Sequence, residues 1–300
     1  MKLTLFVAFV IILFWSAFLF GASYLAKSWI IKTLKLCPAC PTLPSNSVDT
    51  PNPVFSLEST NFSSTGWKDS VSNTVGVVSK TSRKEYKNYN SVLFTQSDNS
   101  KVSFPFDVVS NMNITNQMSI EVWCKPRVFE NYTGIVSQTT SQSPYGGWMM
   151  NTGSGSKYNV AGNPINAFDF GININGTWVT WYRSGTSFAA VSQDGLVVDK
   201  WYHVVGTYDA SGILTMFVNG NVISTQSDLP IWGGTVPLSP AERKIQYQSM
   251  TASLNIGSNC DQSFFDGEVG LCQVYKVALS AQEVFTKYSI SRTIYDSISI

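Results

Sequence analysis

The residues of this chain that could perform acid–base or nucleophilic chemistry are few and widely separated. The only histidine is His203, and the glutamates are scattered: Glu58, Glu85, Glu121, Glu130, Glu242, Glu268 and Glu283. A retaining glycosidase needs two carboxyl groups about 5–5.5 Å apart. A serine or cysteine hydrolase normally needs a base, which His203 alone could supply. Because neither a carboxylate pair nor a partner for His203 is evident, the sequence predicts a protein that is not an enzyme, with His203 packed as a structural residue.

Binding chemistry is better represented, in the segment Ala167–Arg183. Asn175-Gly176 favours a type I′ hairpin turn, because both turn positions need positive φ. Ile174 would then face Thr177, and directly opposed residues share a face of the sheet. One face is apolar and should join the core: Phe168, Phe170, Ile172, Val179 and Trp181. The other mixes aromatic and polar side chains and is the candidate ligand-binding face: Asp169, Asn173, Trp178, Thr180 and Tyr182, with Trp148 from the neighbouring segment 144–148.

Such a face suits a glycan or a protein ligand. Aromatic rings stack on pyranose rings, while carboxamides and carboxylates hydrogen-bond sugar hydroxyls, and exposed aromatic patches mark interaction sites. The alternative is that segment 144–148 covers Trp178 and Tyr182, so that the face is simply packed. The sequence leaves both interpretations open.

Short strands and turns occupy most of the chain after Val54. The run 201–209 alternates as a strand does, and 214–223 predicts two strands around Asn219-Gly220. Leu254–Gly257 and Phe265–Tyr275 follow, and Ser280 with Glu283 forms an S-x-x-E capping box flanked by Leu279 and Val284. The capping box predicts one short helix over about Ala281–Tyr288.

These segments, in this order, resemble laminin-G-like (concanavalin A-like) jelly-roll domains. The resemblance rests on Trp201-Tyr202-His203-Val204, Leu214–Gly220, Phe265–Tyr275 and Ala278–Val284, with Met118–Pro126 upstream. The turn around Thr65–Asn73, and Ser91–Phe94 with Lys101–Phe104 as the next hairpin, extend the likeness over roughly Val54 to Ser289. The resemblance implies an all-β antiparallel sandwich with one short C-terminal helix. Since such domains often bind calcium in rim loops, Asp98, Asp261 and Asp266 become candidate Ca²⁺ ligands, with ordinary turn residues as the favoured alternative.

The N-terminal end predicts a membrane segment. No charged residue occurs from Leu3 to Leu25, which is long enough to cross a bilayer as a helix. Trp29 and the lysines that follow suit an interfacial anchor. A cleaved leader, with Gly21-Ala22-Ser23 as the processing site, is the alternative. The expected organisation is therefore a transmembrane or signal-anchor helix at 1–36, a proline-rich stalk at 37–53, the jelly roll at 54–290 and a tail at 291–300.

The cysteines and the N-glycosylation sequons are evidence on whether the domain lies on the cytosolic or the exoplasmic side of the membrane. The disulfide candidates are Cys37 and Cys40 in a C-x-x-C of the stalk, and Cys124, Cys260 and Cys272 in the β domain, of which one must be free or pair elsewhere. The candidate N-glycosylation sites are Asn61, Asn113, Asn131 and Asn175. Lysines after the membrane segment favour a cytosolic C-terminal side, whereas the sequons and the resemblance favour an exoplasmic one, which is the expectation adopted.

Composition narrows the class of function. With a net charge of +1 and 13% charged residues, nothing resembles a nucleic-acid-binding surface. The first hypothesis is a membrane-anchored module that recognises a glycan or a protein. The second is a structural protein linking a membrane to a surrounding shell, for example in a membrane-containing virion. The third is a secreted glycan-binding domain.

Overall fold

The computed structural model describes residues 50–87, 89–105, 114–130, 133–139, 146–153, 166–174, 177–180, 196–226, 244–245, 253–259 and 262–296. The predicted membrane segment and stalk lie outside these residues, apart from the last residues of the stalk. Among the helices of the described part, none is long and apolar enough to cross a membrane.

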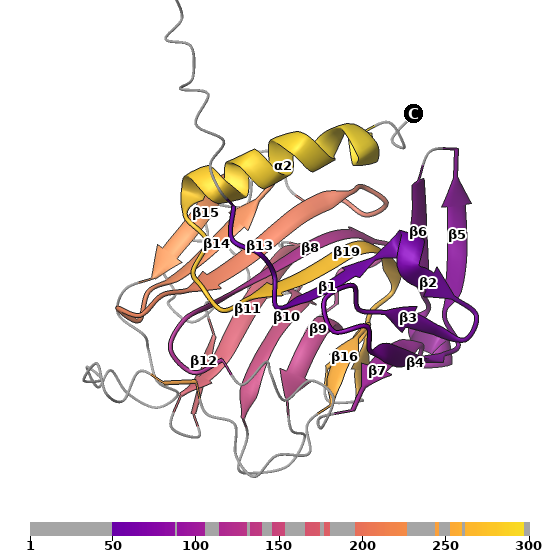
Figure 1. The fold of residues 1–300 in the computed structure, drawn as a ribbon, viewed down its shortest axis with the longest axis horizontal. Helices are drawn as coiled ribbons and strands as arrows, with labels where there is room; N and C mark the ends of the chain where they lie inside the picture. The colour runs from indigo at the N-terminus through magenta and orange to yellow at the C-terminus, as the bar shows by residue number, and fades with distance from the viewer. Residues whose placement is uncertain are drawn as a thin grey trace, which may run out of the picture. The chain divides into compact units, whose positions relative to one another are not determined.

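Two antiparallel-rich sheets form the predicted sandwich (Figure 1). The first, sheet A, has the order β15 (Asn221–Gln226), β14 (Leu214–Val218), β13 (Tyr202–Tyr208), β8 (Met118–Pro126), β19 (Gly267–Tyr275), β6 (Tyr89–Phe94) and β5 (Ser82–Tyr86), with β1 (Phe55–Glu58) also paired to β19. The second, sheet B, has the order β12 (Thr177–Thr180), β11 (Ala167–Ile174), β10 (Gly147–Gly153), β9 (Thr133–Thr139), β16 (Leu254–Ile256), β7 (Lys101–Phe104), β4 (Val75–Ser79), β3 (Gly66–Lys68) and β2 (Phe62–Ser63). Two short strands, β17 (Ser258–Asn259) and β18 (Ser263–Phe264), attach to β9, and η1 (Ser59–Asn61) and η2 (Gln96–Asp98) are single 3₁₀ turns.

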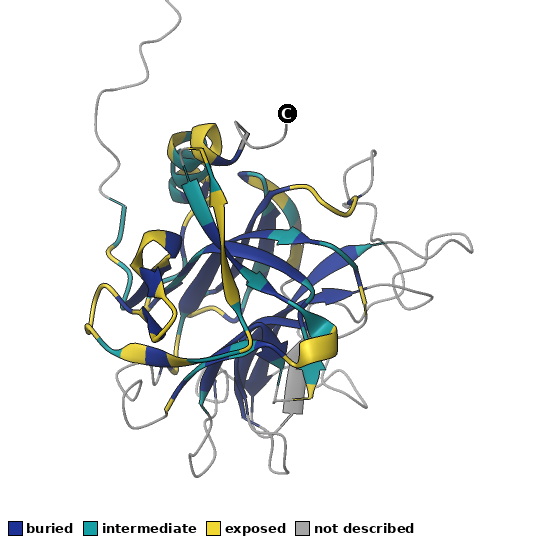
Figure 2. Cartoon of the chain, turned by 90° about the vertical axis from the view of Figure 1, so that its right-hand side faces the viewer, coloured by how far each residue is buried: buried dark blue, intermediate teal, exposed yellow. Residues whose placement is uncertain are grey.

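The core lies between the sheets, where the alternating apolar residues of both layers meet. Figure 2 shows buried residues concentrated in these strands. Phe168, Phe170 and Ile172 of β11 all lie in this core, as their predicted face required. The observed register sets Ile174 opposite Thr177 and Ile172 opposite Val179, which confirms the predicted pairing.

The hairpin at Asn219-Gly220 also forms as predicted. Asn219 and Gly220 have φ of 51° and 77°, and they join β14 to β15 with Val218 opposite Asn221. Positive φ at both turn positions is what a type I′ turn requires.

The C-terminal helix α2 (Ala281–Asp296) begins where the capping box predicts. The Ser280 N–H donates to Glu283 Oε2 at 2.6 Å, and Leu279 and Val284 pack in one cluster. The helix is longer than predicted and crosses the expected domain boundary at 290, because Tyr288 and Tyr295 extend its contact with sheet A. Tyr295 stacks on Trp123 with ring centroids 4.0 Å apart.

One predicted hairpin is wrong. Ser91–Phe94 and Lys101–Phe104 resemble two paired strands, but β6 pairs with β5 and β19 in sheet A, whereas β7 pairs with β4 and β16 in sheet B. The connection contains η2 and Asn99 at φ 54°, so the chain passes from one layer of the sandwich to the other. Two adjacent strands of alternating pattern do not reveal which sheet each one joins.

The β-domain cysteines that the structure describes are not disulfide-bonded. Cys124 and Cys272 are free and fully buried in the core between the sheets. Cys124 lies opposite Val269 and Cys272 opposite Val122, so each thiol packs against apolar neighbours rather than facing the other. Burial raises the pKa of both thiols far above its ordinary value. The disulfide prediction is wrong for these two residues, while Cys37, Cys40 and Cys260 lie outside the described part.

Candidate functional site

The predicted ligand-binding face is the outer face of β10, β11 and β12 in sheet B. Asp169 and Asn173 lie on it, opposite Asn151 and Trp178 respectively. Thr180 is opposite Gly171. The side chains of Trp178 and Thr180, and all of Tyr182, lie outside the described part.

For the residues that can be assessed, the face is covered, as in the second of the two interpretations left open by the sequence. Asp169 and Asn173 have no exposed surface. Strand alternation identifies the face but does not show what packs on it. On the neighbouring strands β9 and β10, residues of β17 cover part of this face. The Ser137 hydroxyl of β9 donates to the Ser258 carbonyl at 2.8 Å, and Asn259 Nδ2 lies 3.4 Å from Met149 Sδ of β10.

Two carboxamides on this face are buried without hydrogen-bond partners. Both the nitrogen and the oxygen of Asn151 and of Asn173 are inaccessible and unpaired, within the part of the chain described. A buried polar group left unsatisfied costs about 1–3 kcal/mol, and such groups are rare enough in folded proteins to need an explanation. Asn151 was not among the predicted site residues, and only its register opposite Asp169 places it there.

Trp148 does not lie on this face. It is opposite Ile172 on β11 and Gln138 on β9, and it packs in the core between the sheets with no exposed surface. The sequence suggested a loop at 144–148, but β10 begins at Gly147, so Trp148 takes the inward position of a strand. Its expected place beside Asp169 and Asn173 is wrong.

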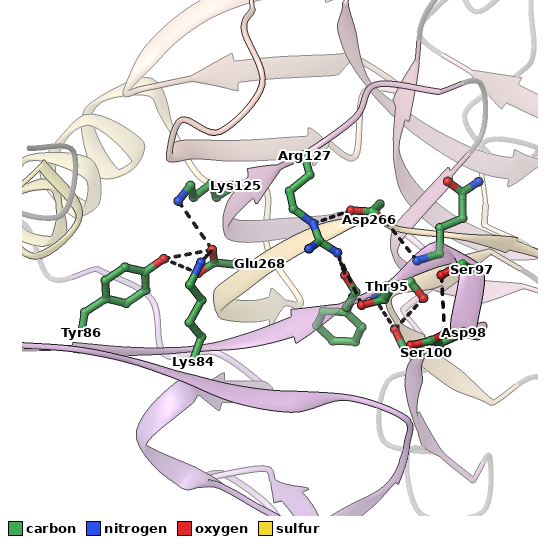
Figure 3. A network of polar contacts seen from close by, with 12 residues as sticks. Lys84, Tyr86, Thr95, Ser97, Asp98, Ser100, Lys125, Arg127, Asp266 and Glu268 are labelled. Carbon is green, nitrogen blue, oxygen red and sulfur yellow. Dashed lines mark hydrogen bonds and ion pairs between the residues drawn. The ribbon is translucent and has the colours of Figure 1, made fainter.

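A second polar cluster lies on the outer face of sheet A, around the carboxylate of Glu268 (Figure 3). Glu268 has 1% exposed surface and accepts hydrogen bonds from Lys84 at 2.8 Å, from the Tyr86 hydroxyl at 2.7 Å and from the Ser91 hydroxyl at 2.6 Å. Lys125 Nζ lies 3.5 Å from the same carboxylate. Burial by itself raises the pKa of Glu268, but these hydrogen bonds and the Lys125 charge outweigh burial and leave the pKa below its ordinary value. The carboxylate is therefore fully engaged, and it ties the edge strand β5 to β19 and β8.

Two of the three candidate calcium ligands, Asp98 and Asp266, lie in the described part of the chain. Asp266 Oδ1 pairs with Arg127 Nε at 2.5 Å, so a guanidinium already neutralises it. Asp98 is exposed on η2, and Asp261 lies outside the described residues. Calcium needs about six to eight oxygen ligands, and the described residues hold no group of three or more His, Cys, Asp or Glu side chains suited to a metal. Calcium binding that involves Asp261 stays a prediction.

His203 lies beneath α2, on the outer face of sheet A. Its Nε2 is 3.0 Å from Glu121 Oε1, and its ring packs beside Trp123 and Tyr288. The Tyr275 hydroxyl donates to Glu121 Oε2 at 2.6 Å. His203 has no exposed surface, which is the packed structural role expected for it.

Among the candidate glycosylation sites, Asn61 is exposed on η1. Asn113, Asn131 and Asn175 lie outside the described residues. Glycosylation at all four positions stays a prediction.

The two packed antiparallel-rich sheets define the class of this protein as a jelly-roll β-sandwich. A family model described as the concanavalin A-like lectin/glucanases superfamily matches residues 94–285. The chain belongs to this superfamily, which confirms the resemblance noted in its sequence. A search of curated proteins finds no match.

Two solved structures have the same fold. Domain 4 of AbnA, a GH43 extracellular arabinanase from Geobacillus stearothermophilus in complex with arabinotriose, has a TM-score of 0.51 and 15% identity over 78% of this chain and 97% of that one. The binding domain of Paraclostridial Mosquitocidal Protein 1 has a TM-score of 0.52 and 18% identity over 79% of this chain and 52% of that one. This chain therefore spans about half the length of the second structure. At these identities the likeness establishes the fold alone.

Proposed function

We propose that this chain is a membrane-anchored, non-enzymatic recognition module that binds a glycan through the outer face of β10–β12. The observation that carries the proposal is the pair of buried, unpartnered carboxamides of Asn151 and Asn173. Because neither side chain is exposed, a glycan would reach them only by displacing the residues that cover this face. Sugar hydroxyls both donate and accept hydrogen bonds, so they suit an amide nitrogen and an amide oxygen equally. Trp178, at the position paired with Asn173, would supply a ring for stacking on the sugar.

Two solved structures with the same fold support a ligand-binding role for this chain. One structure with this fold is a domain in complex with arabinotriose, and the other is a binding domain. A protein ligand for the same face is the competing outcome.

The absence of catalysis belongs to the same proposal. Glu121 and Glu268 are both buried and held by several hydrogen bonds each. His203 is enclosed beneath α2. A general acid or base must reach its substrate within hydrogen-bonding distance, and these three side chains are enclosed by their neighbours.

The anchor and its orientation are proposed from the sequence. The uncharged run from Leu3 to Leu25 would hold the chain in a bilayer, with the jelly roll on the exoplasmic side. Assembly into a shell around that membrane, and a secreted form with a cleaved leader, are the alternatives.

The test compares glycan-array binding of the full chain with that of Asn151→Ala, Asn173→Ala and Trp178→Ala. The two asparagine variants lose no hydrogen bond within the described part of the chain, so any loss of thermal stability should come only from the small cavity that each leaves, whereas binding should fall about tenfold. Asn221→Ala, an exposed asparagine on β15, is the matched control and should bind as the parent does. Equal binding by all four variants would overturn this face as the glycan site, and no glycan signal from the parent would overturn the glycan ligand in favour of the competing protein ligand.

A further inference from the structure

The edge strand β5 of sheet A and its flanks concentrate positive charge. Lys80, Arg83, Lys84 and Lys87 fall within eight residues of sequence, with Glu85 as the one acidic residue among them. All four basic side chains are exposed. The net charge of the whole chain is only +1, so these four residues, called here the basic edge, gather charge in one place.

Charge at the edge of a sheet can serve simply to block pairing with other chains. In that case the strands at the other ends of the two sheets would need it equally. Those strands are β15 of sheet A and β12 and β2 of sheet B, and none of the three contains a charged residue. In β5, by contrast, three of the five residues are charged. General protection of sheet edges therefore does not account for the basic edge.

The backbone of β5 is open on one side. Within the described part of the chain β5 pairs only with β6, from Ser82 opposite Leu93 to Tyr86 opposite Tyr89, and it lies at the outer end of sheet A in Figure 1. In an antiparallel pair, every second residue directs its N–H and C=O away from the partner strand. Four of the five residues of β5 are exposed, so these outward groups can pair with one more strand.

The Glu268 carboxylate holds this edge in a fixed position. Lys84 and the Tyr86 hydroxyl, both on β5, donate to it, and Lys125 Nζ on β8 lies 3.5 Å from it (Figure 3). The ammonium groups of Lys84 and Lys125 also lie 5.5 Å and 5.9 Å from the centre of the Tyr86 ring. Because β5 is already ordered, a strand that adds to it would bear little further cost for ordering β5.

The carboxylates near the basic edge leave much of its charge uncompensated. Glu268 is shared by Lys84 and Lys125, so one carboxylate faces two ammonium groups. Arg83 Nε lies 3.7 Å from Glu85 Oε1, but these side chains are 40% and 76% exposed. Surface ion pairs of this kind contribute only about 0–1 kcal/mol. An anionic partner could therefore take the place of Glu85 beside Arg83 at little cost.

An open strand edge and uncompensated positive charge together fit an extended acidic peptide. Such a peptide would pair with the backbone of β5 and bring carboxylates to its side chains, whereas a sulfated polysaccharide would use the charges alone. A second copy of this chain is disfavoured as the partner. Two β5 strands side by side would place their basic residues close together, and like charges directly opposite destabilise a pair of strands.

We propose that β5 is a docking edge for an extended acidic segment of a partner protein, which adds to sheet A as one more strand and brings its carboxylates to Arg83, Lys84 and Lys87. This site is independent of the candidate glycan face on sheet B and of the N-terminal anchor. A failure of either of those proposals leaves the docking edge unaffected.

The experiment follows the fluorescence anisotropy of a labelled octapeptide of repeating Thr-Glu mixed with the full chain in detergent at low ionic strength. Saturable binding is expected. Arg83→Glu and Lys87→Glu should each weaken it at least about fivefold, because an attraction becomes a repulsion. Lys68→Glu, at an exposed lysine on β3 of sheet B, is the matched control and should bind as the parent does. All three changes are at exposed side chains, so the fold should be retained, as circular dichroism checks.

A second octapeptide, N-methylated at its central residues, tests the addition of a strand, since it keeps the carboxylates and loses backbone donors. It should bind at least about tenfold more weakly than the first. Equal binding of the two peptides would overturn strand addition in favour of a surface that recognises charge alone, as a sulfated polysaccharide would require. No saturable binding by the parent, or equal binding by Arg83→Glu, Lys87→Glu and Lys68→Glu, would overturn β5 as the docking edge.

Discussion

Replacing Glu121 should weaken the attachment of α2 and change how stability depends on pH. Glu121 lies on β8 with 2% exposed surface, and its carboxylate contacts His203 at 3.0 Å, Tyr275 at 2.6 Å and Lys287 at 3.6 Å. Glu121→Ala removes the carboxylate at the centre of a buried charged network, so that His203 and Lys287 lose their contact with it, while the Tyr275 hydroxyl keeps Gln273 as an acceptor. Such changes cost about 3–5 kcal/mol of unfolding free energy. Glu121→Gln keeps the shape and loses the charge, so its cost should be smaller, about 1–3 kcal/mol.

The pH dependence follows from the pKa of Glu121. Burial alone raises this pKa, but the hydrogen bond and charge of His203, the charge of Lys287 and the Tyr275 hydroxyl outweigh burial and leave it below its ordinary value of 4.5. A carboxyl group whose pKa is lowered on folding contributes stability above its unfolded pKa and loses it as pH falls through the folded value. The parent should therefore lose stability as pH falls below about 4.5, and this part of the loss should be missing in Glu121→Gln.

Urea unfolding of the full chain in detergent, followed by tryptophan fluorescence from pH 7 to pH 3, measures both effects. Glu85→Ala is the control, because Glu85 is a strand glutamate with 76% side-chain exposure, and it should change stability by less than about 0.5 kcal/mol. The reasoning fails if Glu121→Ala behaves like Glu85→Ala, or if parent and Glu121→Gln lose stability in parallel as pH falls.

Three further predictions concern the turn, the helix cap and the core. Gly220→Ala should cost about 1–2 kcal/mol in urea unfolding, since Gly220 has φ of 77° and an added Cβ would lie 2.7 Å from the Tyr288 ring; an unchanged midpoint would contradict this close approach. Ser280→Ala should cost about 1 kcal/mol by removing the helix cap, and circular dichroism should show less helix on heating. The thiols of Cys124 and Cys272 should resist iodoacetamide in the folded chain and react in urea, as mapped by peptide mass spectrometry; labelling of the folded protein at either residue would show that the core is open there.

The features predictable from sequence are those set by local chemistry. Asn219-Gly220 determines its own turn, and Ser280 with Glu283 determines where α2 starts. Alternation along β11 identifies the core side chains Phe168, Phe170 and Ile172 correctly. In each case the interacting residues are close in the chain, so the local sequence pattern is enough to predict the local structure.

The features that sequence did not reveal depend on distant contacts. The length of α2 depends on stacking between Trp123 and Tyr295, which are far apart in the chain. The burial of Asp169 and Asn173 depends on what covers the outer face of sheet B, which alternation within one strand does not encode. Likewise Asn151 joins the candidate site only through its register with β11.

The position of β19 has a consequence for biosynthesis. β19 is the last strand of the sandwich to be made, yet it lies inside sheet A, between β8 and β6, and also pairs with β1. A nascent chain that has not reached Tyr275 lacks the strand that joins its earliest and middle parts, so sheet A cannot close while the ribosome is still translating this region. Non-local pairing of this kind slows folding and leaves strand edges open meanwhile. The domain should therefore complete its fold only after β19 has been translated, and a stop codon upstream of β19 should yield an aggregating fragment rather than a shorter functional module.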